Sequence, residues 1–172
     1  KGILDLLSGF AQIIQSEPNL KLVIVGGYPE EHKNYYLKAK ALIEREHLTE
    51  HVRILGYRQD ALKILKCMNF YISPSLSEGL PISLLEAFAA EIPSIATEIP
   101  GNKDVLSNSA FGVLSDPGSS KSLAQGIRKM LALSERERSI IAQNAFNRVR
   151  DNFSVATMAD ETFRLYRQVL NK

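Results

Sequence analysis

Two glutamates, Glu78 and Glu86, stand on either side of a junction that the sequence predicts between a loop and a helix. Small polar residues before Glu78 are typical of a loop that leaves a strand, and residues 82–90 predict a helix that begins after Pro81. The free N–H groups of its first turn, with the helix dipole behind them, form an anion site. A phosphate there would lie between two carboxylates able to hold hydroxyl groups. The ribose, diphosphate and sugar of a nucleotide sugar have this layout.

Short apolar segments alternate with helical patterns along the chain. Apolar residues from Ile3 to Ile14 recur at helical spacing, and a second helix is expected over residues 30–46. Buried strands between helices predict an α/β fold, with a Rossmann-like parallel sheet covered by helices on both faces. The strands are expected at residues 22–25, 52–55, 70–73, 94–97 and 112–115.

Several polar residues are expected to begin helices. Asp60 is placed to cap a helix over residues 61–68, and Ser154 is placed to cap the last helix. Ser134 and Glu137 have the spacing of a capping box, in which side chain and backbone satisfy each other. Long helices are therefore expected to finish the chain.

Four loops follow predicted strands at their carboxyl ends, which is the edge where parallel sheets bind ligands. Tyr57 in one of these loops is either a base-stacking residue or part of the half-buried core. Arg58 and Lys103 are phosphate candidates by charge, although most surface cations are only solvated. The four loops are Gly26–Gly27, Gly56–Tyr57, Ser73–Pro81 and Glu98–Asn102, and the two glycines of the first can also simply terminate a strand.

Composition limits the class of protein. The 172 residues suit one domain, 45% of them are apolar, and the formal net charge is only +2. No basic run is dense enough to predict nucleic-acid binding, and no apolar stretch approaches the roughly 20 residues that span a bilayer. The start of the chain has a helix pattern rather than that of a signal peptide, so a cytoplasmic setting is expected.

The sequence offers no convincing metal site and no nucleophile. The histidines lack ligand spacing, and there is no Asp-x-Asp cluster. Cys67 is the single cysteine, so it has no internal disulfide partner. We expect it to be a small buried apolar residue, because nothing nearby resembles the partner of a nucleophile.

The sequence around the two glutamates resembles the E-x7-E signature of retaining glycosyltransferases of the GT-B fold, in particular the large family 4. SEGLP followed by LLEAFA is similar to the family's loop and helix, and IPSIAT resembles its next strand. The resemblance extends over nearly the whole chain, through KGILDLLSGFAQI, LKLVIVGGYPE, VRILGYRQD, FGVLSDPGSSKSLAQGI and NFSVATMADETFRLYRQVL.

The resemblance implies that residues 1–172 form a single donor nucleotide-sugar-binding domain, the C-terminal half of a two-domain enzyme. Lys1 then corresponds to a lysine that contacts the donor phosphate, and the family's arginine partner is not present. The N-terminal acceptor domain and the first strand of this domain would also be absent from the chain. That strand would lie centrally in a 3-2-1-4-5-6 order.

The resemblance also implies roles for the site residues. Lys1 and Glu78 would be the catalytic residues, with Lys1 and the helix start holding diphosphate and Glu78 holding a sugar hydroxyl. Glu86 would accept hydrogen bonds from ribose. The donor-binding set is Gly26, Gly27, Tyr57, Arg58, Glu78, Gly79, Leu80, Pro81, Ile82, Ser83 and Glu86. Transfer from an NDP-sugar, with UDP as the expected nucleotide, would retain the anomeric configuration and need no metal or other cofactor.

The same resemblance implies partners in polysaccharide or glycoconjugate biosynthesis. The acceptor would be a glycan or lipid held by the missing domain, and the whole enzyme would be cytoplasmic or peripheral at the cytoplasmic face of the membrane. Two other functions stay open. One is a non-catalytic nucleotide-sugar-binding module. Sugar transfer after the N-terminal domain is rejoined would exclude this function. The other is a GT-B-like sugar-nucleotide epimerase, which would place its carboxylates and histidine elsewhere.

Simpler interpretations of the two glutamates stay open as well. Glu86 is also consistent with a charge on the exposed side of a helix. Glu78 is also consistent with a partner of the helix dipole just before the first turn. The base, the sugar and the acceptor are not determined by the sequence.

Overall fold

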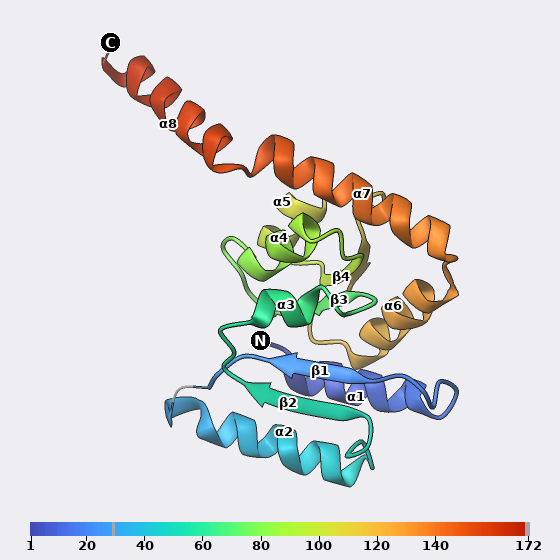
Figure 1. The fold of residues 1–172 in the computed structure, drawn as a ribbon. Helices are drawn as coiled ribbons and strands as arrows, with labels where there is room; N and C mark the ends of the chain where they lie inside the picture. Colours follow the sequence, from blue (N-terminus) through green and yellow to red (C-terminus); the bar gives the residue numbers. More distant parts are fainter. Residues whose placement is uncertain (29, 171–172) are drawn as a thin grey trace.

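The structure, a computed structural model, describes residues 1–28 and 30–170 as an α/β fold (Figure 1). The strands are β1 (Leu22–Val25), β2 (Val52–Gly56), β3 (Tyr71–Ser73), β4 (Ser94–Thr97) and β5 (Val113–Ser115). The helices are α1 (Ile3–Ile14), the 3₁₀ turn η1 (Glu30–His32), α2 (Lys33–Arg45), α3 (Ala61–Leu65), α4 (Ile82–Ala89), α5 (Pro100–Leu106), α6 (Ser120–Ala132), α7 (Glu135–Asn152) and α8 (Val155–Leu170).

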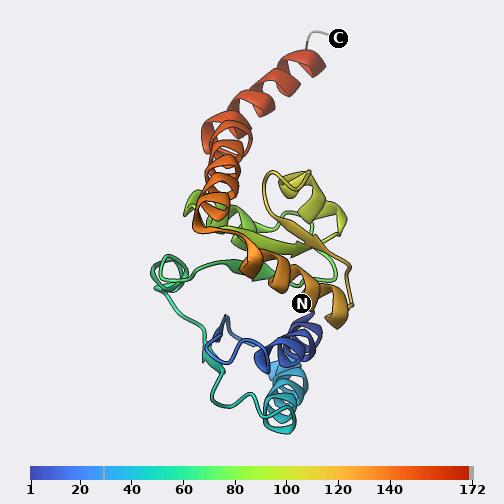
Figure 2. The ribbon, with the colours of Figure 1, turned by 90° about the vertical axis from the view of Figure 1, so that its right-hand side faces the viewer.

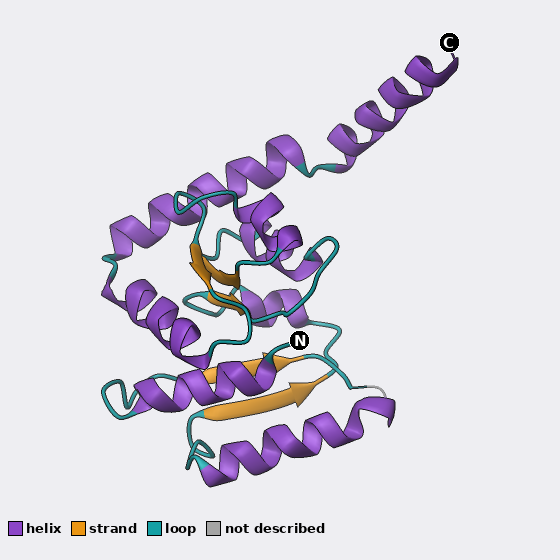
Figure 3. Ribbon diagram, turned by 180° about the vertical axis from the view of Figure 1, so that it is seen from behind, coloured by secondary structure: helices purple, strands orange, loops and turns teal. Residues whose placement is uncertain are grey.

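All described strand pairs are parallel, as the sequence predicts, but they form two sheets rather than one. β1 pairs with β2, and the order of the second sheet is β3-β4-β5. β1 and β3 are not hydrogen-bonded to each other, and a cavity of about 930 Å³ lies beside both strands. No strand of the described residues lies between them, so the expected single sheet is divided at this position (Figure 3).

Helix α1 connects the two halves of the molecule (Figure 2). One side of the helix, with Leu6 and Ile13, packs with the second sheet and α6. Its other side, with Leu7 and Phe10, packs against α2 and β2. At Gly9, an added Cβ would lie 2.6 Å from the carbonyl oxygen of Ser120, so only glycine permits this close approach to α6. The apolar residues of α1 thus hold the halves together in the absence of strand pairing.

Helices α4 and α7 enclose a third apolar cluster around the second sheet. Leu84 and Phe88 of α4 and Ala145 of α7 are fully buried in it. Beyond α7, helix α8 projects away from the rest of the molecule (Figure 1) and contains no buried residue. The start of α4 is therefore fixed by packing, which is what a binding site built on it requires.

Most predicted element boundaries are confirmed to within a residue or two. Ser134 and Glu137 form the predicted capping box. The Ser154 hydroxyl accepts from the N–H of Thr157 at 3.1 Å, so it caps α8 as predicted. Helix α4 begins at Ile82, directly after Pro81, as predicted.

Three predictions near α3 are wrong. Asp60 does not cap the helix, because its carboxylate is paired with Arg58 instead. Helix α3 ends at Leu65 rather than near Met68. After Leu65, the N–H groups of Cys67 and Met68 bond carbonyls three residues earlier instead of the four of an α-helix. Cys67 in this tightened turn is exposed, not buried. The turn lines the cavity beside β1 and β3, so apolar character alone does not bury the thiol.

Among residues 1–28 and 30–170, no helix is long and apolar enough to cross a membrane. The same residues contain no cluster of His, Cys, Asp or Glu side chains suited to holding a metal ion.

Candidate nucleotide-sugar site

The start of α4 lies between the two glutamates. Glu78 is in the loop after β3, and Glu86 is one turn into the helix, where it is exposed. The N–H groups of Leu84 and Leu85 bond the carbonyl of Pro81. The N–H of Ile82 bonds the carbonyl of Leu80 at 3.0 Å, so the prediction that this N–H is free is wrong in this structure.

Ser83 is consequently the residue that presents its backbone at the helix start. Its N–H makes no backbone hydrogen bond with the described residues, and its side chain is exposed. Ser83, Glu78 and Glu86 all line the same 930 Å³ cavity beside β3. The helix start thus offers one N–H, one hydroxyl and the dipole to an anion, with a carboxylate on each side.

Glu78 is held firmly in the loop after β3. Its side chain is 17% exposed, it forms an ion pair with Lys1, and it accepts a hydrogen bond from the Ser75 hydroxyl at 2.7 Å. Burial raises the pKa of Glu78, but the hydrogen bonds from Lys1 and Ser75 outweigh burial and leave the pKa below its ordinary value. Glu78 is therefore a carboxylate acceptor at neutral pH, and the Lys1 ammonium lies next to it.

A buried polar network supports the loop that carries Glu78. The Asn102 amide donates to the carbonyl of Thr97 at 2.9 Å and to its hydroxyl oxygen at 3.2 Å. The Thr97 hydroxyl in turn donates to the carbonyl of Ser75. All three side chains are buried. The ends of β3 and β4 and the start of α5 are therefore linked, which positions Ser75 to bond Glu78.

The loop also packs tightly against the start of α5. A Cβ added at Gly101 would lie 2.5 Å from the carbonyl oxygen of Glu78 and 2.6 Å from that of Gly79. A side chain at position 101 would therefore displace the loop. Gly79 itself is exposed, and a Cβ added there meets nothing within 4 Å.

Tyr71, the first residue of β3, also reaches the start of α4. Its hydroxyl donates to the Ser83 hydroxyl oxygen at 2.8 Å. Burial raises the pKa of Tyr71 and outweighs hydrogen bonds with Ser83 and Ser73, which lower it, and the nearby charges of Glu78 and Glu86 add to the increase. The phenol is thus a protonated donor at neutral pH.

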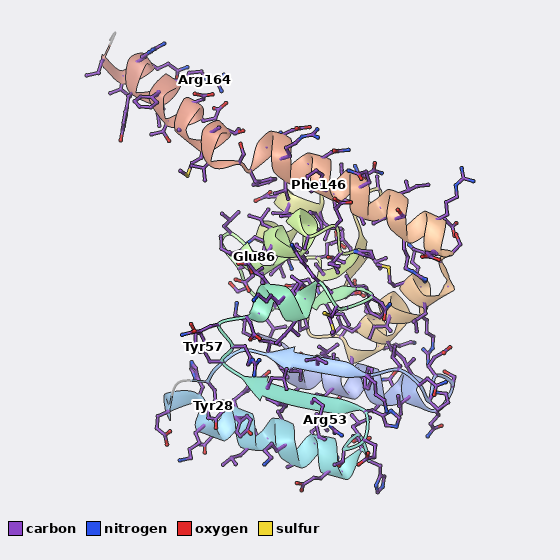
Figure 4. All side chains as sticks on the ribbon, in the orientation of Figure 1. Tyr28, Arg53, Tyr57, Glu86, Phe146 and Arg164 are labelled. Carbon is purple, nitrogen blue, oxygen red and sulfur yellow. The ribbon has the colours of Figure 1, made fainter. Side chains whose placement is uncertain are left out.

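The loops after β1 and β2 lie side by side, as predicted from their positions at strand ends. The N–H of Gly26 bonds the carbonyl of Gly56 at 2.9 Å, and the φ of +148° at Gly26 is one that favours glycine. Gly27 approaches Tyr57, whose side chain is 76% exposed. This exposure excludes the core interpretation of Tyr57 and leaves its ring available for stacking. Figure 4 shows Tyr57 and Glu86 on the same side of the molecule.

The two other cations proposed from the sequence are already paired. Arg58 forms two 2.8 Å hydrogen bonds with the carboxylate of Asp60. Lys103 lies 2.9 Å from the carboxylate of Glu98. The structure therefore does not place either cation free beside Ser83. A phosphate would compete with the acidic partner for either cation.

The structure adds residues that sequence reasoning did not assign. Ser75 and Asn102 lie within loops already expected at the sheet edge. Their positions could therefore be predicted from the sequence, but their hydrogen-bond partners could not. Tyr71 and Thr97 lie within strands, where they read as ordinary strand residues. Hydrogen bonds between segments 12 to 22 residues apart gave no signal in the sequence.

Comparison with known proteins agrees with this geometry. The family model for glycosyl transferases group 1 matches residues 1–148. The chain is 27% identical over 176 residues to the capsular polysaccharide biosynthesis glycosyltransferase CapM of Staphylococcus aureus, covering all of this chain and 44% of CapM. It is 29% identical over 126 residues to the UDP-Gal:alpha-D-GlcNAc-diphosphoundecaprenol alpha-1,3-galactosyltransferase of Escherichia coli, covering 73% of this chain and 32% of that protein.

The fold matches solved glycosyltransferase structures. A glycosyltransferase from Rickettsia africae superposes with a TM-score of 0.90 at 25% identity, over 99% of this chain and 45% of that one. The chain thus has the parallel-sheet architecture of GT-B glycosyltransferases. It belongs to the glycosyl transferases group 1 family. It spans less than half the length of the two curated relatives above.

Proposed function

We propose that this chain is the donor-binding domain of a glycosyltransferase and holds an NDP-sugar across the start of α4. The observation that carries the proposal is that exposed Ser83, whose N–H has no backbone partner among the described residues, lines the same cavity as Glu78 and Glu86. A diphosphate needs donors and positive potential, whereas ribose and sugar hydroxyls need acceptors. The start of α4 supplies the donors and the positive potential for the diphosphate, and Glu86 and Glu78 supply the acceptors for ribose on one side and sugar on the other.

Each group has a role in this proposal. Glu86 accepts from the ribose hydroxyls, and the exposed ring of Tyr57 stacks on the base. Glu78, ionised and fixed by Ser75, accepts from a hydroxyl of the sugar. Lys1 exchanges part of its pairing with Glu78 for the diphosphate. Gly26 and Gly27 leave room for the nucleotide beside the loop after β2.

Transfer proceeds by breaking the bond between the anomeric carbon and the diphosphate oxygen while the acceptor oxygen bonds that carbon from the same face, and the acceptor's proton passes to the departing diphosphate. Negative charge then accumulates on the departing diphosphate, and preorganised donors that stabilise this charge lower the barrier. Lys1, Ser83 and the dipole of α4 are those donors. The account requires retention at the anomeric carbon but assigns neither glutamate as a nucleophile. It needs no metal or other cofactor.

The gap between β1 and β3 supports a second part of the proposal, that one further parallel strand belongs there. Such a strand would pair with both free edges and give a continuous sheet in the expected 3-2-1-4-5-6 order. It would lead into α1 through Lys1. A second domain, which carries the acceptor site, would close the cleft over the donor. The share of its relatives that this chain covers supports a larger protein.

The named relatives support the substrate class. One acts in capsular polysaccharide biosynthesis, and the name of the other contains UDP-galactose and a diphosphoundecaprenol acceptor. UDP is therefore the proposed nucleotide, and a glycan or lipid-linked glycan is the proposed acceptor. A lipid-linked acceptor would place the whole enzyme peripherally at the cytoplasmic face of a membrane.

A transfer assay tests the proposal. The intact protein is incubated with UDP-, GDP- and ADP-sugars and with glycan and lipid-linked acceptors, and the product and its anomeric configuration are determined. We expect a UDP-sugar to be used with retention. Residues 1–172 alone should show no turnover, because the acceptor side of the cleft is supplied elsewhere. Binding of donors without transfer to any acceptor would favour the non-catalytic module, and epimerisation of the donor would favour the epimerase.

A further inference from the structure

The Tyr71 hydroxyl fixes which way the hydrogen of the Ser83 hydroxyl can point. A serine hydroxyl has one hydrogen to donate and can rotate to suit its neighbours. The Ser83 oxygen already accepts the Tyr71 proton at 2.8 Å, so its own hydrogen must point elsewhere. A phenol is the stronger donor of the two hydroxyl types, which sets the direction of this bond.

The surroundings of Tyr71 preserve this arrangement. The residue is only partly exposed and begins β3, whose backbone is fixed because Tyr71 is in register with Ser94 and its N–H bonds the carbonyl of Pro93 at 2.9 Å. The raised pKa described above keeps the phenol protonated and therefore able to donate. Ser83 is at the second position of α4, where it is exposed toward the cavity.

We infer that Tyr71 is a positioning residue that converts the Ser83 hydroxyl into a dedicated donor to the diphosphate of the bound nucleotide. This inference rests on the proposed function, because it requires the diphosphate to lie at the start of α4. Without the phenol, the Ser83 hydroxyl would be free to rotate, and it could donate its hydrogen to a nearby carboxylate instead of the diphosphate. Tyr71 itself does not touch the ligand.

A double-mutant cycle tests the inference. The affinity of the intact protein is measured by calorimetry for the tightest binder among UDP, GDP and ADP. Tyr71→Phe removes only the hydroxyl and should weaken binding about fivefold, the size expected for one hydrogen bond. Ser83→Ala should weaken it at least as much. If Tyr71 acts through Ser83, the double variant should bind no more weakly than Ser83→Ala alone.

Two further readouts separate positioning from a structural role. The affinity for the corresponding nucleoside, which lacks phosphate, should be unchanged in Tyr71→Phe. Its midpoint of urea unfolding should also stay close to that of the parent protein. Tyr166→Phe is the control, because this tyrosine is exposed on α8 and does not line the cavity, and the substitution should leave diphosphate affinity unchanged.

The outcomes distinguish the inference from the proposed function. If the parent protein binds a nucleoside diphosphate but Tyr71→Phe binds it equally well, the inference is wrong and the proposed function stands. Tyr71→Phe could also weaken binding as much in the Ser83→Ala background as in the parent. Tyr71 would then contact the ligand or support the fold directly, and the inference would be overturned. If the parent binds none of the three nucleotides, the proposed function is overturned, and the inference with it.

Discussion

Lys1 and Glu78 form an ion pair although 77 positions separate them in the sequence. The pair joins the start of α1 to the loop before α4, so a cation expected to meet phosphate and a carboxylate expected to meet sugar lie in contact. Each partially neutralises the other before any ligand binds. A donor whose diphosphate attracts Lys1 would leave the Glu78 carboxylate free to accept from a sugar hydroxyl.

The first prediction separates sugar recognition from nucleotide recognition. Glu78→Ala should sharply reduce turnover with the NDP-sugar and change the affinity for the plain NDP little, because a contact made to the reacting sugar appears in turnover. Steady-state kinetics and calorimetry on the intact protein measure the two quantities. Equal losses in both would instead make Glu78 a residue of the fold or of the phosphate site.

The second prediction concerns acid stability. The pKa of Glu78 is depressed in the folded protein, so its contribution to stability is fully present above the unfolded value of about 4.3 and is lost as the pH falls through the folded value. The parent should exceed Glu78→Gln in free energy of unfolding at pH 7, and this excess should shrink toward pH 3. Urea unfolding at several pH values measures it.

Lys1→Met provides the control for that experiment. Without the ammonium group, the pKa of Glu78 should move up toward its unfolded value, so the pH-dependent loss of stability should be smaller and complete at a higher pH than in the parent. The difference in free energy of unfolding between the parent and Glu78→Gln could instead stay constant or grow as the pH falls. That result would contradict the assignment of Glu78 as an ionised, hydrogen-bonded carboxylate.

The third prediction concerns the packing of α5 against the Glu78 loop. Gly101→Ala should lower the free energy of unfolding by about 1–3 kcal/mol, because its Cβ would press on two loop carbonyls. Gly79→Ala is the matched control, since its Cβ would meet open space. Only the first variant should shift the unfolding midpoint appreciably. Equal midpoints for the two variants would mean that the loop yields without cost.

The fourth prediction concerns Arg148 of α7, which binds the carbonyl oxygens of Val105 at 2.5 Å and Asp104 at 2.6 Å near the end of α5. Its guanidinium also lies 5.2 Å from the centre of the Phe111 ring. Arg148→Ala should cost about 1.5–3 kcal/mol of stability, the range for hydrogen bonds to a charged group.

Arg148→Lys should recover only part of that loss, because a single ammonium cannot reproduce the planar fork of a guanidinium. Arg150→Ala is the control on the same helix, as that side chain pairs with its exposed neighbour Asp151 and lies over the Phe146 ring but, among the described residues, binds no backbone carbonyl of another element. Chemical denaturation of the four proteins gives the comparison. If Arg148→Ala unfolds at the same midpoint as Arg150→Ala, the carbonyl contacts contribute nothing to stability.

Local patterns predicted most of the fold because the physical causes are themselves local. The strand at residues 94–97 is fully buried, as its apolar character indicated, and Ser134 with Glu137 formed the capping box that their spacing required. Asp60 failed as a cap because Arg58, two residues away, competes for the same carboxylate. A helix cap is predicted from the type of one residue. Whether its side chain bonds the helix depends on every donor within reach of that side chain.

The positions of Glu78 on a loop and of Glu86 on the helix after it were predicted from the sequence, but the contacts that support Glu78 were not. Both positions follow from local patterns, because a loop, a proline and a helix occur together in one short segment. The support for Glu78 comes from Asn102 through Thr97, which lie on other elements. Such contacts depend on how strand ends are placed in space, and a single sequence does not encode that placement in any local pattern.

The measurement that tests the central claim most directly is calorimetric titration of the intact protein and its Glu86→Gln variant with UDP. The substitution preserves shape but removes charge-assisted acceptance from the ribose hydroxyls, which is worth roughly 1.5–3 kcal/mol per bond. The account predicts that the parent binds UDP and that the variant binds it at least about tenfold more weakly. An unchanged dissociation constant in Glu86→Gln would contradict the placement of the nucleotide across the start of α4.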